Sequence, residues 1–205
     1  MKTEKQIKRR EQIEAAAYEL LAEKGYKATS MLAIAKRASA SNETLYNWYG
    51  TKQAVFSALV AANAQSAREI LDDAHNSSAD PLKILEQLGP ALLQIVTSEK
   101  AVALNRAAAI DMYETRLLGK TIAAGGKKAI LPLLRKLFLK ARASKLMVFD
   151  DDNDVAKTYI FLLIGDVQIE RVIGVRPVLT RKQITARANK ATELILRLYG
   201  TAGAG

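Results

Sequence analysis

Cysteine, proline and glycine are scarce in this chain. Of its 205 residues, none is cysteine, 4 are proline and 11 are glycine. The absence of cysteine excludes disulfides, thiolate metal sites and thiol redox sensing. Proline and glycine are the main breakers of helices, so their scarcity beside 49% hydrophobic residues predicts an all-α protein.

Apolar runs are short as well. No stretch approaches the roughly 18 uncharged apolar residues that a membrane span requires, so no membrane partner is expected. The N-terminal segment, residues 1–14, is densely charged and lacks the apolar core of a signal peptide. These features together predict a soluble, cytoplasmic protein.

Groups that could build a metal or catalytic centre are also lacking. The single histidine, His75, falls in a polar segment, residues 75–81, that is predicted to be a loop. Asp150, Asp152 and Asp154 have the spacing that opens a calcium loop, but Val155 replaces the glycine needed at its sixth position. No nucleophile–base pair and no glycine-rich phosphate loop occurs. We therefore predict no metal, no cofactor and no enzymatic activity.

Helical periodicity and positive charge are what the chain does contain. Lys and Arg number 31 against 21 Asp and Glu, a net charge of +10, which suits a polyanion such as nucleic acid.

The helical segments can be placed along the chain. Gly25 is expected to end the first helix in a left-handed cap. Apolar spacings of three and four predict helices over 7–24, 52–74, 81–97, 100–113, 115–124, 127–144, 152–173 and 180–199.

The segment 31–49 carries the most specific pattern. It predicts two short helices joined by a sharp turn, with small Ala35 and Ala40 at the corner where the helices approach each other. Apolar spacing assigns the inner faces to Ile34, Ala35 and Ala38 on the first helix and Leu45, Trp48 and Tyr49 on the second. The outer face of the second helix then presents polar side chains to the edges of bases in a major groove: Asn42, Glu43, Tyr46 and Asn47.

This part of the chain resembles the N-terminal domain of the TetR family of bacterial regulators. The likeness covers about residues 7–60 and rests on Gly25-Tyr26, Thr29-Ser30, Ile34-Ala35, Ala38, Thr44-Leu45-Tyr46-Asn47-Trp48-Tyr49 and Lys52. Ser39 departs from the pattern, because the family prefers glycine at this turn position. A left-handed serine is less favourable than glycine, so two outcomes stay open: a slightly strained turn, or a turn that avoids positive φ. Asn42-Glu43 also differs from the usual start of the second helix, which affects the operator that is read.

The resemblance implies an N-terminal three-helix helix-turn-helix domain, residues 1–52, and a larger helical ligand-binding and dimerisation domain, residues 53–205. Helix 52–74 is the expected connector. Asn42 and Thr44 are expected to contact base edges, and Glu43 a cytosine. Phosphate contacts are expected from Thr29, Ser30, Tyr46, Asn47 and Lys52, with Ser41 capping the second helix at the same surface.

A basic cluster precedes this domain, at Lys5, Lys8, Arg9 and Arg10. Two interpretations stay open: a solvated helix end, or contact with flanking phosphates or an adjacent minor groove. Helix-start signals further predict that Thr29 or Ser30 caps the second helix and that Thr51 caps the fourth.

The C-terminal helices are expected to join two copies and to enclose a ligand. A helix-turn-helix reads two half-sites as a dimer, and the resemblance implies a four-helix interface. Its predicted residues are Tyr159, Leu163, Val167, Ile184, Ala188, Ala191, Leu194, Ile195 and Leu198. The resemblance also implies a small-molecule pocket, with predicted lining residues Gln94, Asn105, Arg106, Met112, Tyr113, Phe138, Tyr159, Phe161 and Gln168.

The function predicted from these features is sequence-specific transcriptional regulation by a homodimer. The expected form is a repressor that a small-molecule effector releases from a pseudo-palindromic, double-stranded DNA operator. The alternative is a helical protein-interaction adaptor that kept the fold without ligand-controlled DNA binding. Thr44, Tyr46 and Lys52 and the positive charge argue against that alternative.

Overall fold

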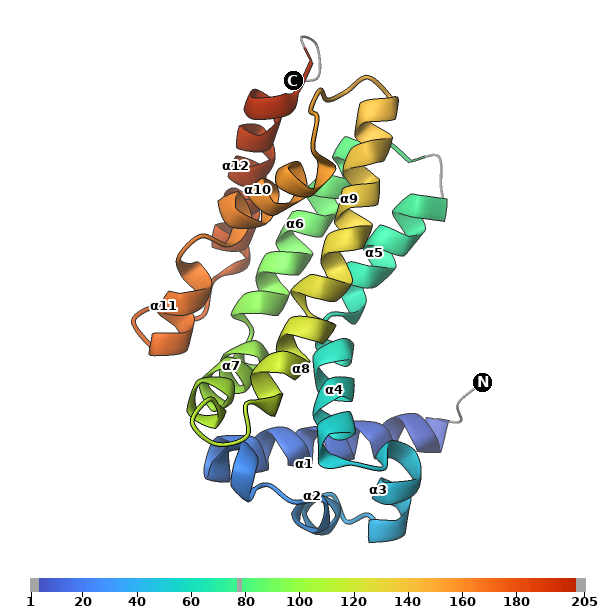
Figure 1. Cartoon of the computed structure of the whole chain (residues 1–205), viewed down its shortest axis with the longest axis vertical. Helices are drawn as coiled ribbons and strands as arrows, with labels where there is room; N and C mark the ends of the chain where they lie inside the picture. Colours follow the sequence, from blue (N-terminus) through green and yellow to red (C-terminus); the bar gives the residue numbers. More distant parts are fainter. Residues whose placement is uncertain (1–3, 77–78, 202–205) are drawn as a thin grey trace. The chain divides into compact units, whose positions relative to one another are not determined.

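The computed structural model describes residues 4–76 and 79–201, and helices account for most of them (Figure 1). The all-α prediction is therefore confirmed. The helices are α1 (Glu4–Ala28), α2 (Met31–Arg37), α3 (Asn42–Tyr49), α4 (Lys52–Asn63), α5 (Gln65–Asn76), α6 (Pro81–Thr97), α7 (Glu99–Asp111), α8 (Leu117–Gly125), α9 (Lys127–Ala143), α10 (Asp152–Ile164), α11 (Val167–Ile173) and α12 (Arg181–Tyr199).

The chain divides into two compact units. Unit 1 comprises residues 1–63 and 99–125, and unit 2 comprises residues 64–98 and 126–205. Unit 1 thus holds α1 to α4 together with α7 and α8, and unit 2 holds the other six helices of the described chain. Unit 1 therefore combines the N-terminal helices with α7 and α8, which come from the middle of the sequence.

Unit 1 has a core built from one face of α1 and the helices that cover it. Ile13, Leu20 and Leu21 point into it at helical spacing and are buried. Tyr26 and Phe56 meet edge to face with their ring centroids 5.0 Å apart, which ties the end of α1 to α4. Figure 1 shows α2 and α3 beside α1, and α4 crosses α1 and contacts both α1 and α3. This arrangement supports the short helices from one side and leaves their other side exposed.

Gly25 interrupts α1 as predicted, although its conformation differs from a standard left-handed cap. Its φ of 72° is positive, but its ψ of 174° is extended, so the chain resumes a last helical turn through Ala28. A residue with a Cβ is strained at this φ. The predicted end of the regular helix near Lys24 is therefore confirmed, and the chain reverses direction soon after it.

Unit 2 is a bundle in which α6 packs against α5, α9, α10, α11 and α12. Phe138 and Tyr159, both fully buried, meet edge to face with centroids 5.9 Å apart. Gly89 permits the close approach of α6 to α10 and α12, because a Cβ there would lie 2.8 Å from the Tyr159 hydroxyl and 3.0 Å from the Ala188 Cβ. Glycine is thus required at this helix crossing for reasons of space.

The predicted continuous helix over 52–74 is wrong. Helix α4 ends at Asn63 and α5 begins at Gln65, with Ala64 in a turn between them. The apolar residues of α4, such as Phe56 and Leu59, belong to the core of unit 1, while Ala67 and Leu71 of α5 belong to the core of unit 2. The break at Ala64 thus falls where the chain passes from the core of one unit to the core of the other.

Two other local predictions are corrected. The predicted helix over 152–173 is divided at Gly165, whose φ of 48° ends α10. The Arg187 guanidinium donates hydrogen bonds to the carbonyls of Leu163 (2.6 Å) and Ile164 (3.0 Å), which satisfies the end of that helix. His75, predicted in a loop, belongs instead to the last turn of α5. Residues 77–78 of the predicted loop lie outside the described part.

Candidate DNA-binding site

Helix α2 begins with a side-chain cap. The Ser30 hydroxyl accepts a hydrogen bond from the backbone N–H of Ala33 at 3.1 Å, so Ser30 is the predicted cap, and the Ser30 side chain is exposed. Thr29 is fully buried, and its hydroxyl donates to the Gly25 carbonyl at 2.8 Å. A phosphate contact from Thr29 stays a prediction, and its hydroxyl already has an intramolecular partner.

The turn between α2 and α3 forms a Schellman motif. The N–H of Ser39 donates to the Lys36 carbonyl (3.2 Å), and that of Ala40 donates to the Ala35 carbonyl (2.9 Å). Ser39 has a φ of 51°, so of the two open outcomes the structure has the left-handed, strained one, at the position where the family prefers glycine. The motif ends α2 sharply and directs the chain into α3.

Helix α3 is short and strongly capped. The Ser41 hydroxyl accepts from the Thr44 N–H at 3.0 Å and lies 2.7 Å from the Thr44 hydroxyl. Leu45 is fully buried beneath the helix and fixes it to unit 1. Gly50, at a φ of 71°, ends the helix, and the Thr51 hydroxyl then caps α4 by accepting from the Ala54 N–H at 3.1 Å.

The outer face of α3 is exposed, as predicted. Asn42, Glu43 and Asn47 are exposed, Thr44 is half-buried, and Tyr46 is 50% exposed. Trp48 was predicted on the inner face, but it is 41% exposed and lines a surface hollow together with Gln6, Arg10, Tyr49, Ala54 and Ala58. An eight-residue helix needs little inner surface, and Leu45 with part of Tyr49 supplies it.

Lys52 lies at the start of α4 and contacts the end of α1. Its ammonium donates hydrogen bonds to the carbonyls of Tyr26 (2.8 Å) and Lys27 (3.3 Å), and it lies 4.3 Å from the centroid of the Tyr26 ring. Burial lowers the pKa of Lys52, while the negative charges of Asp111 and Glu114 oppose this shift. Its predicted phosphate contact remains untested, and the structure adds an internal role.

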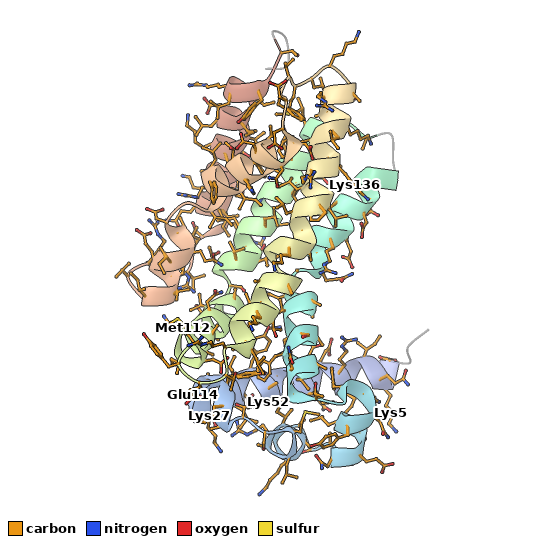
Figure 2. The ribbon with its side chains drawn as sticks, in the orientation of Figure 1. Lys5, Lys27, Lys52, Met112, Glu114 and Lys136 are labelled. Atoms are coloured by element: carbon orange, nitrogen blue, oxygen red, sulfur yellow. The ribbon has the colours of Figure 1, made fainter. Side chains whose placement is uncertain are left out.

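A turn between α7 and α8 meets this junction within unit 1. Lys27 pairs with Glu114 at 3.5 Å, and Figure 2 shows Lys27, Lys52 and Glu114 close together. The buried Asp111 carboxylate accepts from the Thr115 hydroxyl (2.6 Å) and the Leu118 N–H (3.0 Å), which fixes the start of α8. Burial alone would raise the pKa of Asp111, but these hydrogen bonds outweigh burial and hold it below its usual value.

The basic residues of the N-terminal cluster differ in their partners. Arg10 pairs with Glu14 one helical turn away, at 3.1 Å. Arg9 reaches across to the α2–α3 turn, where its Nη1 donates to the carbonyls of Ala38 (3.1 Å) and Ser39 (2.9 Å). Lys5 and Lys8 are exposed. The sequence did not reveal that Arg9 contacts the turn, because 30 residues separate Arg9 from Ser39.

Comparison with known families agrees with this geometry. Residues 13–59 match the profile described as bacterial regulatory proteins, tetR family, and residues 83–201 match the AefR-like transcriptional repressor, C-terminal domain. The second match covers more than half of the chain.

The chain belongs to the TetR family.

It is therefore a DNA-binding transcriptional regulator. TetR-family regulators bind DNA operators and small molecules and act as dimers. The N-terminal resemblance inferred from sequence is confirmed, while the C-terminal match was not recognisable from its helical pattern.

Individual relatives support the same assignment. The chain is 31% identical over 87 residues to YvkB, an HTH-type transcriptional regulator of Bacillus subtilis (strain 168) described as uncharacterized. That match covers 42% of this chain and 44% of YvkB, so it spans less than half of the relative's length. Among solved structures, a TetR transcriptional regulator from Agrobacterium tumefaciens has a TM-score of 0.72 and 27% identity, covering 95% of this chain and 96% of that one. The flavonoid-responsive regulator FrrA has a TM-score of 0.69 and 26% identity, with coverage of 96% and 99%.

The predicted ligand-pocket residues of this TetR-family chain fall in both units. Asn105, Arg106, Met112 and Tyr113 belong to unit 1, and Tyr113 is 84% exposed. In unit 2, Phe138 and Tyr159 meet edge to face in the core, Phe161 and Gln94 are exposed, and the Gln168 amide donates to the Val96 carbonyl at 3.4 Å. Within unit 2 the structure thus brings Phe138 and Tyr159 together, and the pocket itself stays a prediction.

Most predicted dimer-interface residues lie inside the protomer. Six of the nine are buried in it: Tyr159, Leu163, Val167, Ala188, Ala191 and Ile195. Ile184 and Leu194 are half-buried, and Leu198 is 61% exposed. A side chain with no exposed surface cannot itself touch a second copy, so an interface on these helices would use their exposed apolar residues.

Two general features of the described chain complete the picture. Across residues 4–76 and 79–201, no group of three or more histidine, aspartate or glutamate side chains is arranged to hold a metal ion. Within the same ranges, no helix is both long and apolar enough to cross a membrane.

Asp111→Asn tests how the α7–α8 turn supports unit 1. An amide would direct an N–H group at a hydrogen-bond donor, so we expect a loss of about 1–3 kcal/mol in the free energy of unfolding at neutral pH. The pKa of the Asp111 carboxyl in the folded chain lies below its pKa in the unfolded chain, so the ionised carboxylate stabilises the fold. Its stabilisation is therefore present above about pH 4 and is lost as pH falls through the folded value.

The measurement is chemical denaturation of both proteins from neutral to acidic pH, with the exposed Asp73→Asn as control. The difference between native and Asp111→Asn protein should shrink on acidification. A difference that stays constant would show that the Asp111 charge does not stabilise the fold.

Proposed function

We propose that the chain is a homodimeric repressor that binds a pseudo-palindromic operator and leaves it when a small molecule binds. The observation that carries this proposal is the geometry of α3, which is capped at both ends, anchored by Leu45 and exposed on its polar face. Such a helix fits a major groove, where exposed amides and carboxylates distinguish bases. The match to an AefR-like repressor domain supports repression over activation, and a regulator of this kind acts in the cytoplasm.

The division of labour follows the domains predicted from sequence. Residues 1–52 read the DNA, and residues 53–205 bind the effector and join the protomers. Part of that second segment, residues 53–63 and 99–125, packs in the same compact unit as the DNA-reading helices. The adaptor alternative is not favoured, because both matched profiles describe transcriptional regulators.

Base contacts and phosphate contacts on this surface are separable by experiment. Asn42→Ala or Thr44→Ala should relax the preference at particular base pairs by about 1–3 kcal/mol. Lys52→Ala should weaken binding to every duplex and reduce the salt slope by about one, since phosphate contacts release counterions. The measurement is the affinity for two duplexes, by fluorescence anisotropy at several salt concentrations. One duplex is the sequence that the native chain selects from a random library, and the other is a shuffled version of it.

Lys52 also bonds to two backbone carbonyls, so its replacement should lower the melting temperature too. An unchanged salt slope in a folded Lys52→Ala protein would remove Lys52 from the phosphate contacts.

A dimer of this chain should use the exposed apolar residues of α10, α11 and α12. These are Phe161, Ile169, Ile173 and Leu198, each 55–64% exposed. Leu198→Glu places a charge in the proposed interface, where an unpaired charge costs several kcal/mol. Sedimentation should then show monomers, and operator affinity should fall because one reader makes half of the contacts.

Val148→Glu is the matched control, since Val148 is 68% exposed and lies outside these helices. Dimers of Leu198→Glu as stable as those of Val148→Glu would place the interface on another surface.

Ligand release requires that effector and operator oppose each other. Each must reduce the affinity of the other by the same factor. FrrA is described as flavonoid-responsive, so a panel of flavonoids is a reasonable first set of probes for this chain. Calorimetric titration of each flavonoid with and without operator gives both affinities.

Tyr159→Phe removes a hydroxyl that donates to the Leu85 carbonyl at 3.4 Å and keeps the ring that meets Phe138 edge to face. It should weaken effector binding, and an unchanged affinity would remove the Tyr159 hydroxyl from the proposed pocket. Tyr199→Phe removes a surface hydroxyl from the same unit and is the control. Equal effector affinities with and without operator would end the inducible-repressor proposal.

A further inference from the structure

The turn that precedes the recognition helix contains an unfavourable residue. Ser39 occupies the left-handed position of the Schellman motif, with a φ of 51°. A Cβ is disfavoured in this conformation, which is why glycine is common there. The motif also leaves the carbonyls of Ala38 and Ser39 beyond the end of the helix, without partners in the α2 ladder. Something outside the turn must make this geometry favourable.

Arg9 of α1 supplies that support. Its Nη1 donates to the Ala38 carbonyl at 3.1 Å and to the Ser39 carbonyl at 2.9 Å. Hydrogen bonds from a charged donor are stronger than those between neutral groups. One guanidinium nitrogen therefore joins the two peptide units on either side of the strained residue and fixes them to α1. Arg37, which pairs with Glu19 and Glu23, ties the end of α2 to the same helix.

Unit 2 contains a parallel arrangement. Helix α9 ends in the same motif, with Lys145 at a φ of 58° and the Leu146 N–H bonded to the Ala141 carbonyl at 3.0 Å. There the Thr201 hydroxyl donates to the Lys145 carbonyl at 2.9 Å. In both turns a distant side chain donates to the carbonyl of the left-handed, non-glycine residue. The Arg9 contact thus follows a pattern that recurs in this chain.

We propose that Arg9 is a positioning residue for sequence recognition and that it acts on the turn, not on a phosphate. By holding Ser39 in its left-handed conformation, Arg9 fixes the direction in which α3 leaves the turn, and thereby the placement of Asn42 and Thr44. Small errors in such placement reduce specific binding far more than non-specific binding, because base contacts depend on orientation and charge attraction does not. The proposal goes beyond the function proposed above, since it concerns a residue outside the DNA-reading face.

The test compares Arg9→Gln with Lys8→Gln. Both variants remove one positive charge from neighbouring positions of α1, and Lys8 is exposed. Affinity is measured for the duplex that the native chain enriches from a random library and for a shuffled duplex, at several salt concentrations. Arg9→Gln should reduce the ratio of specific to non-specific affinity roughly tenfold, while its salt slope stays equal to that of the native chain. Lys8→Gln should leave the ratio unchanged.

A phosphate contact gives the opposite result. It would flatten the salt slope of Arg9→Gln by about one while leaving the specificity ratio near that of the native chain, and this outcome overturns the proposal. If Arg9→Gln fails to fold, as judged by circular dichroism, Arg9→Lys replaces it. That variant keeps the charge, but its side chain is one bond shorter and does not bring the ammonium to the position of Nη1, so its ratio should fall with no change in slope. A native ratio in folded Arg9→Lys and Arg9→Gln would also overturn the proposal.

The strained serine provides a second, independent readout. Ser39→Gly removes the Cβ that disfavours the left-handed conformation, so the turn then needs less support. The loss of specificity caused by Arg9→Gln should be several-fold smaller in the Ser39→Gly background than in the native background, as a double-mutant cycle measures. An equal loss in both backgrounds would show that Arg9 does not act through the turn.

Discussion

The recognition helix depends on the turn before it. Helix α3 has eight residues, too few to be stable in isolation, so its conformation and direction must come from its surroundings. Leu45 anchors one side of it, and Ser41 satisfies its first N–H groups. The Schellman motif at Ser39 sets the angle at which it departs from α2. Sequence recognition in this chain is therefore a property of the α2–α3 corner as a whole.

Cations in unit 1 act on backbone carbonyls as well as on acidic groups. Arg9 donates to the carbonyls that end α2, and Lys52 donates to those that end α1. Both helix ends carry partial negative charge, so a cation there complements the dipole and satisfies orphan acceptors at once. Arg9 and Lys52 keep their positive charge, but some of their N–H donors are already used within the protein, so a count of basic residues overstates the number of donors free to bond to phosphates.

The features that sequence could predict are those with local causes. Ser30, Ser41 and Thr51 were identifiable as caps because a cap depends on a hydroxyl a few residues before a helical stretch. The turn at Ser39 was identifiable from family resemblance, but its left-handed conformation was settled only by the structure. The exposure of Trp48 was not, because helical spacing gives the direction of a side chain but not the thickness of the layer beneath it.

The features that sequence missed have tertiary causes. The break at Ala64 arises because α4 and α5 serve different cores, although the residues around it read as one amphipathic helix. The break at Gly165 depends on Arg187, which lies more than 20 residues further along the chain. For the same reason, the predicted dimer residues were assigned to a surface when most of them line the core. Periodicity identifies an apolar face, but it does not distinguish the protomer's own core from a partner.

The break at Ala64, which the sequence did not predict, lies where the chain passes from one unit to the other. The chain crosses between the two units at residues 63/64, 98/99 and 125/126, and at each crossing one helix ends and another begins. The continuous helix over 52–74 that was expected as the connector is therefore interrupted at the first of these crossings. At the second crossing, Arg171 and Gln168 of α11 donate to the carbonyls of Thr97 and Val96, the last residues of α6. Helix α11 also carries exposed Ile169 and Ile173, so two of the apolar residues proposed for the dimer interface belong to the helix that is hydrogen-bonded to the end of α6.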